Sequence, residues 1–177
     1  TGKIGRKVIE HLHGFGCRIL AYDLYPNHSL DSLAEYVSLD ELLERCDILS
    51  LHAPATKDNY HLIDKSALAR MKDGVMIINA ARGTLVDSDA LIEGIESGKV
   101  GGAALDVLED EAGLYYRNLS GEVLTNHQMA ILKSFPNVIL SPHTAFYTDD
   151  AVAEMCRCVF ESVRAFEAGE DNPLEAT

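Results

Sequence analysis

The sequence predicts an α/β fold built on a doubly wound parallel sheet. Three observations predict it: short apolar runs alternate with helical patterns along residues 1–148, a Gly-x-x-Gly turn leads straight into the first helical pattern, and ionisable residues stand just after several apolar runs. Short buried strands separated by helices favour a parallel sheet covered on both faces. Right-handed crossovers then bring the carboxyl ends of the strands to one ligand-binding edge.

Each element is expected from its own pattern. The strands are short apolar runs bounded by polar or turn residues, expected at 19–22, 36–37, 48–52, 75–79, 103–107 and 138–140. The helices show apolar residues three and four positions apart, expected at 3–13, 39–45, 65–70 and 87–97. After residue 148 one long amphipathic helix is expected at 149–168, followed by a polar tail to residue 177.

Composition excludes some partners. A net charge of -13 argues against nucleic acid or an anionic membrane surface. No apolar run approaches the roughly eighteen residues of a membrane span, and no signal-like start is visible.

The four cysteines lack zinc or redox spacing, so free thiols in a reducing cytoplasm and no metal site are expected. His52 is expected to pack at a strand end. Solvated positions are expected for five others: His11, His13, His28, His61 and His127.

The Gly-x-x-Gly turn, Gly2-Lys3-Ile4-Gly5, matches the latter part of a dinucleotide fingerprint. Backbone N–H groups of Lys3 and Ile4 would face a pyrophosphate at the helix N-terminus. Because the first glycine of the fingerprint is absent, the chain is expected to begin inside the motif, as a fragment that is unstable alone. The strand before the turn would lie between strands 19–22 and 48–52, which would leave these two about 10 Å apart without direct ladder hydrogen bonds.

Asp23 ends the first apolar run, about twenty residues after the glycines. A carboxylate there can accept both ribose hydroxyls of an adenosine, and it repels a 2′-phosphate. The sequence therefore predicts NAD, and not NADP, as the cofactor.

Three ionisable residues follow the ends of successive apolar runs: Arg82 in N-A-A-R-G-T, Glu111 in L-D-V-L-E-D-E and His143 in L-S-P-H-T-A-F. An arginine fork suits a carboxylate, an imidazole suits proton transfer near neutral pH, and a glutamate beside it favours the imidazolium. Taken singly, each could be a surface ion pair or a turn residue. Glu109 competes with Glu111 for the same pairing.

These motifs, with L-H-A-P-A-T-K-D-N and H-T-A-F-Y-T, resemble the D-isomer-specific 2-hydroxyacid dehydrogenases, and are most similar to the D-lactate dehydrogenase branch, which also shows an insert like 113–128. The resemblance implies a Rossmann NAD-binding domain at 1–148, with 149–177 returning to a substrate domain that is otherwise absent. It implies a cytoplasmic homodimer, and it selects Glu111 over Glu109.

The resemblance also implies roles for residues along the cofactor. Asp106 would hold the nicotinamide carboxamide with Ala80 and Arg82 nearby, although a plain strand-terminating acid is the alternative for Asp106. Ala53 and Pro54 would lie along the adenosine and pyrophosphate, and Asn59 near the nicotinamide. Relatives often carry a small hydroxyl residue where this chain has Ala80-Ala81.

The implied function is NAD-dependent interconversion of a D-2-hydroxy acid and a 2-oxo acid, expected to be D-lactate and pyruvate. The alternative is an NAD(H)-sensing, corepressor-like binding protein on the same fold. Phe146 and Tyr147 could shape the substrate pocket or could simply pack.

Overall fold

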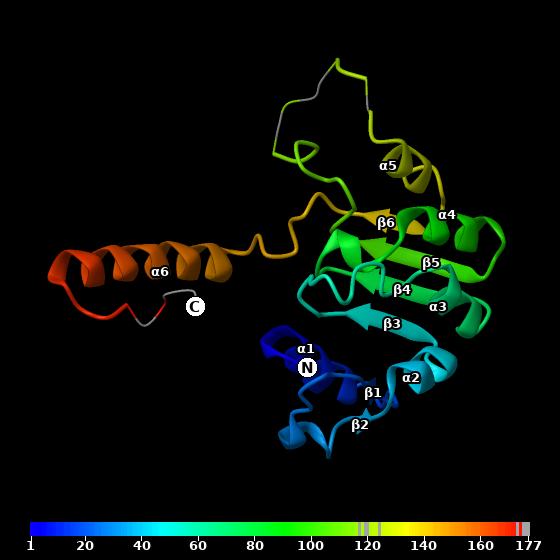
Figure 1. Cartoon of the computed structure of the whole chain (residues 1–177), viewed down its shortest axis with the longest axis horizontal. Coiled ribbons are helices and arrows are strands. Elements are labelled where there is room, and N and C mark those ends of the chain that lie inside the picture. The colour runs from blue at the N-terminus through cyan, green and yellow to red at the C-terminus, as the bar shows by residue number, and fades with distance from the viewer. Residues whose placement is uncertain (117, 119–120, 124, 173, 175–177) are drawn as a thin grey trace. The chain divides into compact units, whose positions relative to one another are not determined.

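The computed structural model describes residues 1–116, 118, 121–123, 125–172 and 174. The chain forms two compact units, Thr1–Pro142 and His143–Thr177 (Figure 1). Parts of the 113–128 insert and the tail residues 173 and 175–177 lie outside the described residues. The division into a nucleotide domain at 1–148 and a returning segment at 149–177 stays a prediction.

The first unit contains two parallel sheets. β1 (Leu20–Ala21) pairs with β2 (Glu35–Tyr36) in one sheet. The other sheet has the order β3 (Ile48–Leu51), β4 (Val75–Asn79), β5 (Val100–Leu105) and β6 (Val138–Leu140). Among the described residues no backbone ladder joins β1 to β3. The strand order expected from the sequence places another strand between these two. The spacing of about 10 Å between them stays a prediction.

The helices of the first unit start at capping residues. They are α1 (Lys3–His13), η1 (His28–Leu30), α2 (Leu39–Arg45), α3 (Lys65–Arg70), η2 (Gly83–Leu85), α4 (Ser88–Glu96) and α5 (His127–Leu132). Five side chains accept a hydrogen bond from a backbone N–H in the first turn of the helix that follows: Asn27, Ser38, Asp64, Asp87 and Asn126. Such caps satisfy donors that have no partner inside the helix, which fixes where each helix begins.

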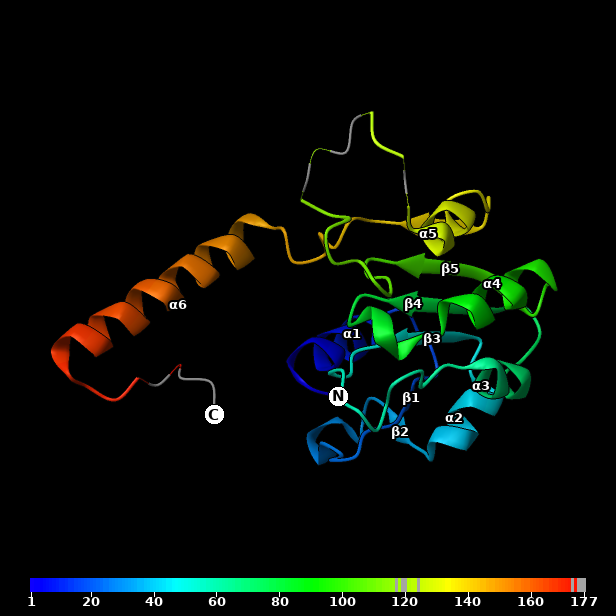
Figure 2. The same cartoon turned by 45° about the horizontal axis from the view of Figure 1, so that its top comes forward.

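The main core lies between the four-stranded sheet and the layer formed by α2, α3, α4 and α5 (Figure 2). Alternate strand residues such as Leu49 and Ile77 point into it and are fully or almost fully buried. The opposite face of the same sheet carries Ile48, Met76 and Ile139, exposed by 58%, 50% and 71%. Apolar side chains on both faces explain the continuous apolar runs of these strands.

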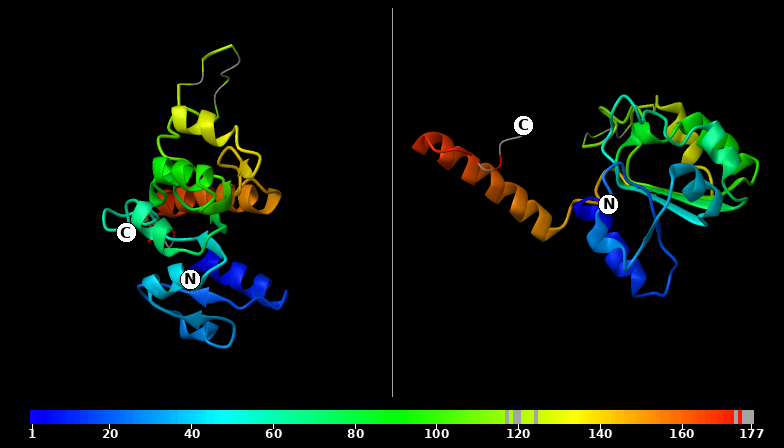
Figure 3. Two further views of the ribbon diagram at one scale, coloured as in Figure 1. Left: turned by 90° about the vertical axis from the view of Figure 1, so that its right-hand side faces the viewer. Right: turned by 60° about the horizontal axis from the view of Figure 1, so that its bottom comes forward.

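A second, smaller core belongs to the two-stranded sheet. Ile9 of α1 packs there with Ala21, Leu30 and Ala34. Figure 3 shows the blue helix α1 near the blue strands of this sheet. Gly5 of α1 lies against His52, whose Cβ would be 3.4 Å from a Cβ at position 5. This contact places the glycine turn beside the loop that follows β3, and it confirms the packing expected for His52.

The structure adds three helices to those expected, α5, η1 and η2, and it changes the bounds of β1, β2, β3, β5 and α4 by one to three residues. α5 was not predicted, and His127 is its first residue, not part of a polar loop. β5 begins at Val100, three residues earlier than expected, because it starts with Gly101 and Gly102, which lower strand propensity. Gly101 is required there, since a Cβ would come within 2.5 Å of the Gly74 carbonyl oxygen.

The second unit is dominated by α6 (Asp149–Ala168), with the bounds that the sequence predicted. Thr148 caps its start, and Gly169 ends it in the left-handed conformation at φ 67. The predicted apolar stripe includes Val159, Phe160 and Phe166, exposed by 62%, 71% and 86%. Within the described ranges no helix combines the length and apolar character that a membrane crossing requires.

Candidate active site

The glycine turn leaves the N-terminus of α1 open. Gly2 is the N-cap and offers no side-chain hydrogen bond, and no acid stands in the first turn. No atom lies within 4 Å of a Cβ built on Gly2, and both Lys3 and Ile4 are exposed. The first backbone N–H groups of an eleven-residue helix therefore face open space, as an anion such as a pyrophosphate requires.

Asp23 lies beside this turn, just after β1. Its carboxylate accepts hydrogen bonds from Thr1 Oγ1 at 2.8 Å and from the Tyr25 backbone N–H at 2.9 Å. Partial burial opposes ionisation, while the hydrogen bonds from Tyr25 and Thr1 Oγ1 favour the charged carboxylate. Asp23 is thus an ionised acceptor at the glycine turn, where a ribose would need one.

The loop after β3 is held by its own side chains. Asn59 Oδ1 accepts from the Thr56 backbone N–H and Nδ2 donates to the Pro54 carbonyl oxygen, both at 2.8 Å. Asn59 therefore shapes the loop of Ala53 and Pro54, and its placement near a nicotinamide stays a prediction. Burial lowers the pKa of His52, which keeps that ring neutral beside the glycine turn.

Arg82 stands on the loop after β4, which the buried Asn79 shapes. Asn79 Oδ1 accepts from the Ala81 N–H at 3.0 Å, and Nδ2 donates to the Arg82 carbonyl oxygen at 2.9 Å. Arg82 is exposed, and its guanidinium donates to the Ala81 carbonyl oxygen at 2.6 Å. Ala80 is exposed as well. The structure therefore presents Arg82 to solvent from a fixed backbone.

Asp106 is buried directly after β5, next to the Arg82 loop. Its backbone N–H donates to the Asn79 carbonyl oxygen at 2.9 Å, and its carboxylate accepts from Ser141 Oγ at 2.6 Å. Ser141 follows β6 and was not among the predicted site residues. Ser141 comes directly after the predicted strand 138–140, and this position was the sequence signal that could have identified it. Adjacent strand ends thus share a buried polar cluster.

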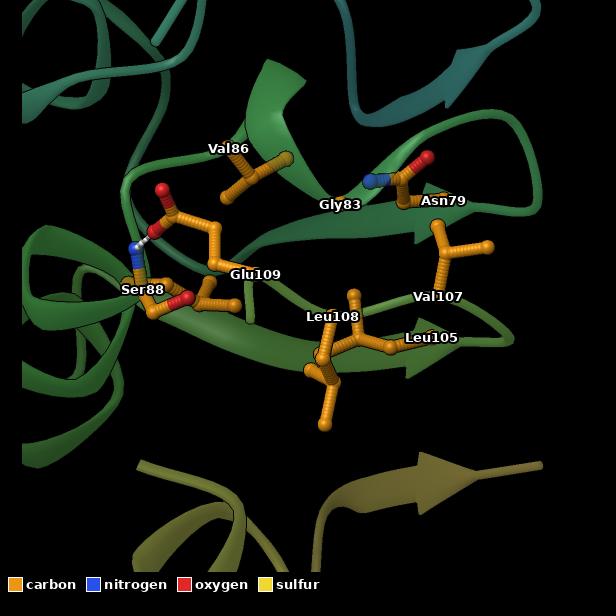
Figure 4. Close-up of a pocket in the computed structure, with 9 residues that line it drawn as sticks. Asn79, Gly83, Val86, Ser88, Leu105, Val107, Leu108 and Glu109 are labelled. Atoms are coloured by element: carbon orange, nitrogen blue, oxygen red, sulfur yellow. Dashed lines mark hydrogen bonds between the residues drawn. The ribbon is translucent and has the colours of Figure 1, made fainter. Parts of the chain in front are cut away.

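Backbone contact joins the loops after β4 and β5. A Cβ on Gly83 would lie 2.0 Å from the Leu108 carbonyl oxygen, so only glycine fits there. The pocket lined by these residues in Figure 4, including Asn79, Ser88 and Glu109, has a volume of about 10 Å³. It is too small for a ligand. This small cavity lies where the loop that carries Arg82 packs against the loop that follows Asp106.

Gly83→Ala is expected to destabilise the protein by about 1–3 kcal/mol, because the added methyl group must separate two packed backbones. Gly14→Ala is the matched control: Gly14 has helical dihedral angles, and an added Cβ would lie 3.4 Å from the His11 carbonyl oxygen. The control is expected to change stability by less than about 0.5 kcal/mol. Urea denaturation measures both changes, and equal effects would contradict the close approach.

The two candidate glutamates differ in their contacts. Glu111 accepts from the Leu108 backbone N–H at 2.9 Å within its own loop. Glu109 instead accepts from the Ser88 backbone N–H at 2.9 Å and lies 2.6 Å from His61 Nε2. The expectation that His61 is solvated was wrong, because its side chain contacts Glu109 and is only 26% exposed. Sequence could not reveal a pair separated by 48 positions.

His143 begins the second unit, in a left-handed backbone conformation at φ 52. Non-glycine residues rarely adopt this region, and such strain concentrates at functional sites. The imidazole meets Phe146 edge-on at 6.4 Å between centroids, and Phe146 meets Tyr147 in the same way at 6.0 Å. Phe146 thus packs on His143, and Tyr147 packs on Phe146 and is 71% exposed. The pairing of His143 with Glu111 stays a prediction.

The described part of the chain contains no candidate metal site and has both buried and exposed thiols. No group of three histidine, cysteine or acidic side chains there could hold a metal ion. Cys46 is a buried free thiol whose pKa burial raises, and Cys17 and Cys156 are exposed.

Comparison with known proteins relates this geometry to one family. Residues 1–145 match the family described as D-isomer specific 2-hydroxyacid dehydrogenase, NAD binding domain. The chain is 51% identical over 168 residues to an aromatic 2-oxoacid reductase of Clostridium sporogenes, covering 94% of the chain and 51% of that protein. It is 44% identical over 167 residues to a D-lactate dehydrogenase of Lactiplantibacillus plantarum, covering 94% and 50%.

Solved structures agree. A D-lactate dehydrogenase of Treponema pallidum superposes with a TM-score of 0.96 at 38% identity, over 100% of this chain and 54% of that one. The D-lactate dehydrogenase of Lactobacillus jensenii with NAD⁺ gives a TM-score of 0.92 at 33% identity, over 100% and 53%. The chain thus spans about half the length of the relatives it matches. The chain belongs to the D-isomer-specific 2-hydroxyacid dehydrogenase family and contains its NAD-binding domain.

Proposed function

We propose that the protein containing this chain is an NAD-dependent D-2-hydroxyacid dehydrogenase that interconverts D-lactate and pyruvate. One observation carries the proposal: Arg82 and Glu111 stand on loops that follow adjacent parallel strands and touch at Gly83 and Leu108. A carboxylate-binding guanidinium and an acid are thereby held at the ligand-binding edge of a nucleotide-binding sheet.

The roles of the residues follow from the chemistry of the reduction. NADH, when bound, supplies a hydride to the carbonyl carbon and leaves as NAD⁺. Arg82 binds the substrate carboxylate through two hydrogen bonds from its planar guanidinium group, and it orients the carbonyl for attack on one face. His143 donates the proton that the carbonyl oxygen takes up. Glu111 pairs with His143 and stabilises the imidazolium before transfer.

The proposed cofactor contacts come from two places: the glycine turn and the residues that follow the strands. The open helix start at Gly2, Lys3, Ile4 and Gly5 receives the pyrophosphate. Asp23 accepts the ribose hydroxyls, which excludes a 2′-phosphate. The remaining contacts lie along the adenosine, pyrophosphate and nicotinamide: Ala53, Pro54, Asn59, Ala80, Arg82 and Asp106. The buried and hydrogen-bonded carboxylate of Asp106 supports its role toward the carboxamide.

The resemblance also supports a homodimer acting in the cytoplasm. The buried free thiol Cys46 is consistent with a reducing compartment. Size-exclusion chromatography with light scattering on the full-length protein tests the dimer, and a monomeric mass would refute it.

The activity is tested with the full-length protein, NADH and a 2-oxo acid. Pyruvate is expected to cause loss of the reduced-cofactor absorbance, and the product is expected to be D-lactate by chiral chromatography. Phenylpyruvate is the comparison substrate, because one relative is named as an aromatic 2-oxoacid reductase. A higher kcat/KM for phenylpyruvate would reassign the substrate. Binding of NADH without turnover of either acid would instead support the NAD(H)-sensing alternative, which the names of the relatives do not favour.

A further inference from the structure

Glu109 connects three loops of the first unit through one carboxylate. Its Oε2 accepts the Ser88 backbone N–H at 2.9 Å, at the first residue of α4, and its Oε1 lies 2.6 Å from His61 Nε2 (Figure 4 shows the Ser88 contact). The Glu109 side chain is only 18% exposed. A carboxylate that faces both a helix N-terminus and an imidazole is held from two directions.

His61 is itself firmly anchored. Its backbone lies in the left-handed region at φ 52, and its N–H donates to the Thr84 carbonyl oxygen at 2.8 Å. Its ring stacks on Tyr60 at 3.9 Å, and Nδ1 lies 3.6 Å from Asp87 Oδ2. A residue stays in such a strained conformation only when its surroundings fix it. His61 is therefore a rigid support for Glu109.

The supported loop is the one that carries Glu111. Glu109 lies between Leu108, whose N–H donates to Glu111 Oε2, and Asp110, which has a left-handed backbone at φ 51. The turn is thus fixed at Leu108 by the contact with Gly83 and at Glu109 by its carboxylate. If the carboxylate is removed, the part of the turn nearest Glu111 loses its anchor.

We propose that Glu109 is a positioning residue: locked by His61 and Ser88, it holds the turn after β5 so that Glu111 keeps its place in the reaction. The inference rests on the proposed function for the role of Glu111. It also explains why two acids stand close together in this motif, one as a structural anchor and one facing the chemistry.

The expected effect falls on kcat more than on cofactor binding. The loop after β3 keeps its own hydrogen bonds through Asn59 and its pairing of Ile63 with Leu85 when Glu109 is lost. Glu109→Ala in the full-length protein is therefore expected to lower kcat with pyruvate about tenfold. The dissociation constant of NADH, followed by fluorescence, is expected to stay within about twofold.

Glu109→Gln separates hydrogen bonding from charge. The glutamine oxygen can accept from Ser88, and its amide can donate to Nε2 of a neutral His61 whose Nδ1–H faces Asp87. This variant is expected to recover most of the kcat that alanine loses. The control is Glu93→Ala, since Glu93 pairs only at the surface with Lys65 and is 59% exposed; its kcat is expected to equal that of the unmodified protein.

A double-mutant cycle tests whether Glu109 acts through Glu111. In a Glu111→Gln background, Glu109→Ala is expected to lower kcat by less than about twofold, because the group it positions is already inactive. Independent, multiplicative losses would overturn the proposal, as would equal losses for Glu109→Ala and Glu109→Gln.

Hydrogen exchange tests the anchor without any turnover. Amides of residues 108–111 are expected to exchange at least about tenfold faster in Glu109→Ala and His61→Gln than in Glu109→Gln. Unchanged exchange in the first two would refute the anchor. If no 2-oxo acid is reduced by the unmodified protein, the proposed function fails, and the exchange result still decides whether Glu109 holds the turn. Should Glu109→Ala fail to fold, His61→Gln provides the same comparison.

Discussion

His143→Gln in the full-length protein is expected to lower kcat for pyruvate reduction by about 10²–10⁴-fold, because a positioned proton donor contributes that much. The amide cannot donate a proton and be reprotonated near neutral pH as an imidazole can. The affinity for NADH is expected to stay within about twofold, since the proposed cofactor contacts lie in residues 2–106. Stopped-flow absorbance gives the first quantity, and fluorescence titration gives the second.

Because His143 has a left-handed backbone, a substitution there can also add backbone strain, and a second variant is the control for that effect. Asparagine tolerates this conformation better than glutamine does, so His143→Asn removes the proton donor with less backbone strain. Both variants are expected to lose activity to a similar extent. Recovery of kcat in His143→Asn would show that strain, and not proton transfer, caused the loss. Turnover close to that of the unmodified protein in either variant would remove His143 from the chemistry.

Asp23→Ala is expected to reduce the preference for NADH over NADPH by tenfold or more. Hydrogen bonds to a charged group contribute about 1.5–3 kcal/mol, which corresponds to about 10–150-fold in affinity, and the carboxylate also repels a 2′-phosphate. An aspartate carboxylate is charged at neutral pH. The ratio of kcat/KM for the two cofactors is the measurement.

Two further variants isolate the cause at Asp23. Asp23→Asn keeps the size of the side chain and removes its charge, so it is expected to relieve the repulsion of NADPH while retaining part of the binding of NADH. Asp31→Ala removes an exposed acid of the same unit that pairs with His28, and it is expected to leave the preference unchanged. If Asp23→Ala leaves the preference ratio as it was, Asp23 has no place in the ribose site.

The sequence by itself determined the elements whose local pattern is strong. Helix α6 keeps the predicted bounds because its apolar stripe, its Thr148 cap and its left-handed Gly169 act within one segment. Strand β4 does so because five apolar or buried positions are bounded by turn residues. The parallel direction of the strands was also predicted from the helices that connect them.

Only the tertiary structure decided how loops distant in sequence hold one another. The contact of His61 with Glu109 joins residues 48 positions apart, and Ser141 donates a hydrogen bond to Asp106 across 35 positions. The sequence does not reveal either partner, because the two residues of each pair follow different strands of the sheet. Gly83 is similar: its sequence context suggests a turn, while the reason for glycine is the backbone of Leu108. Local periodicity fixes elements, but the spacing between strand ends is set by sheet packing, and that packing determines which polar groups meet.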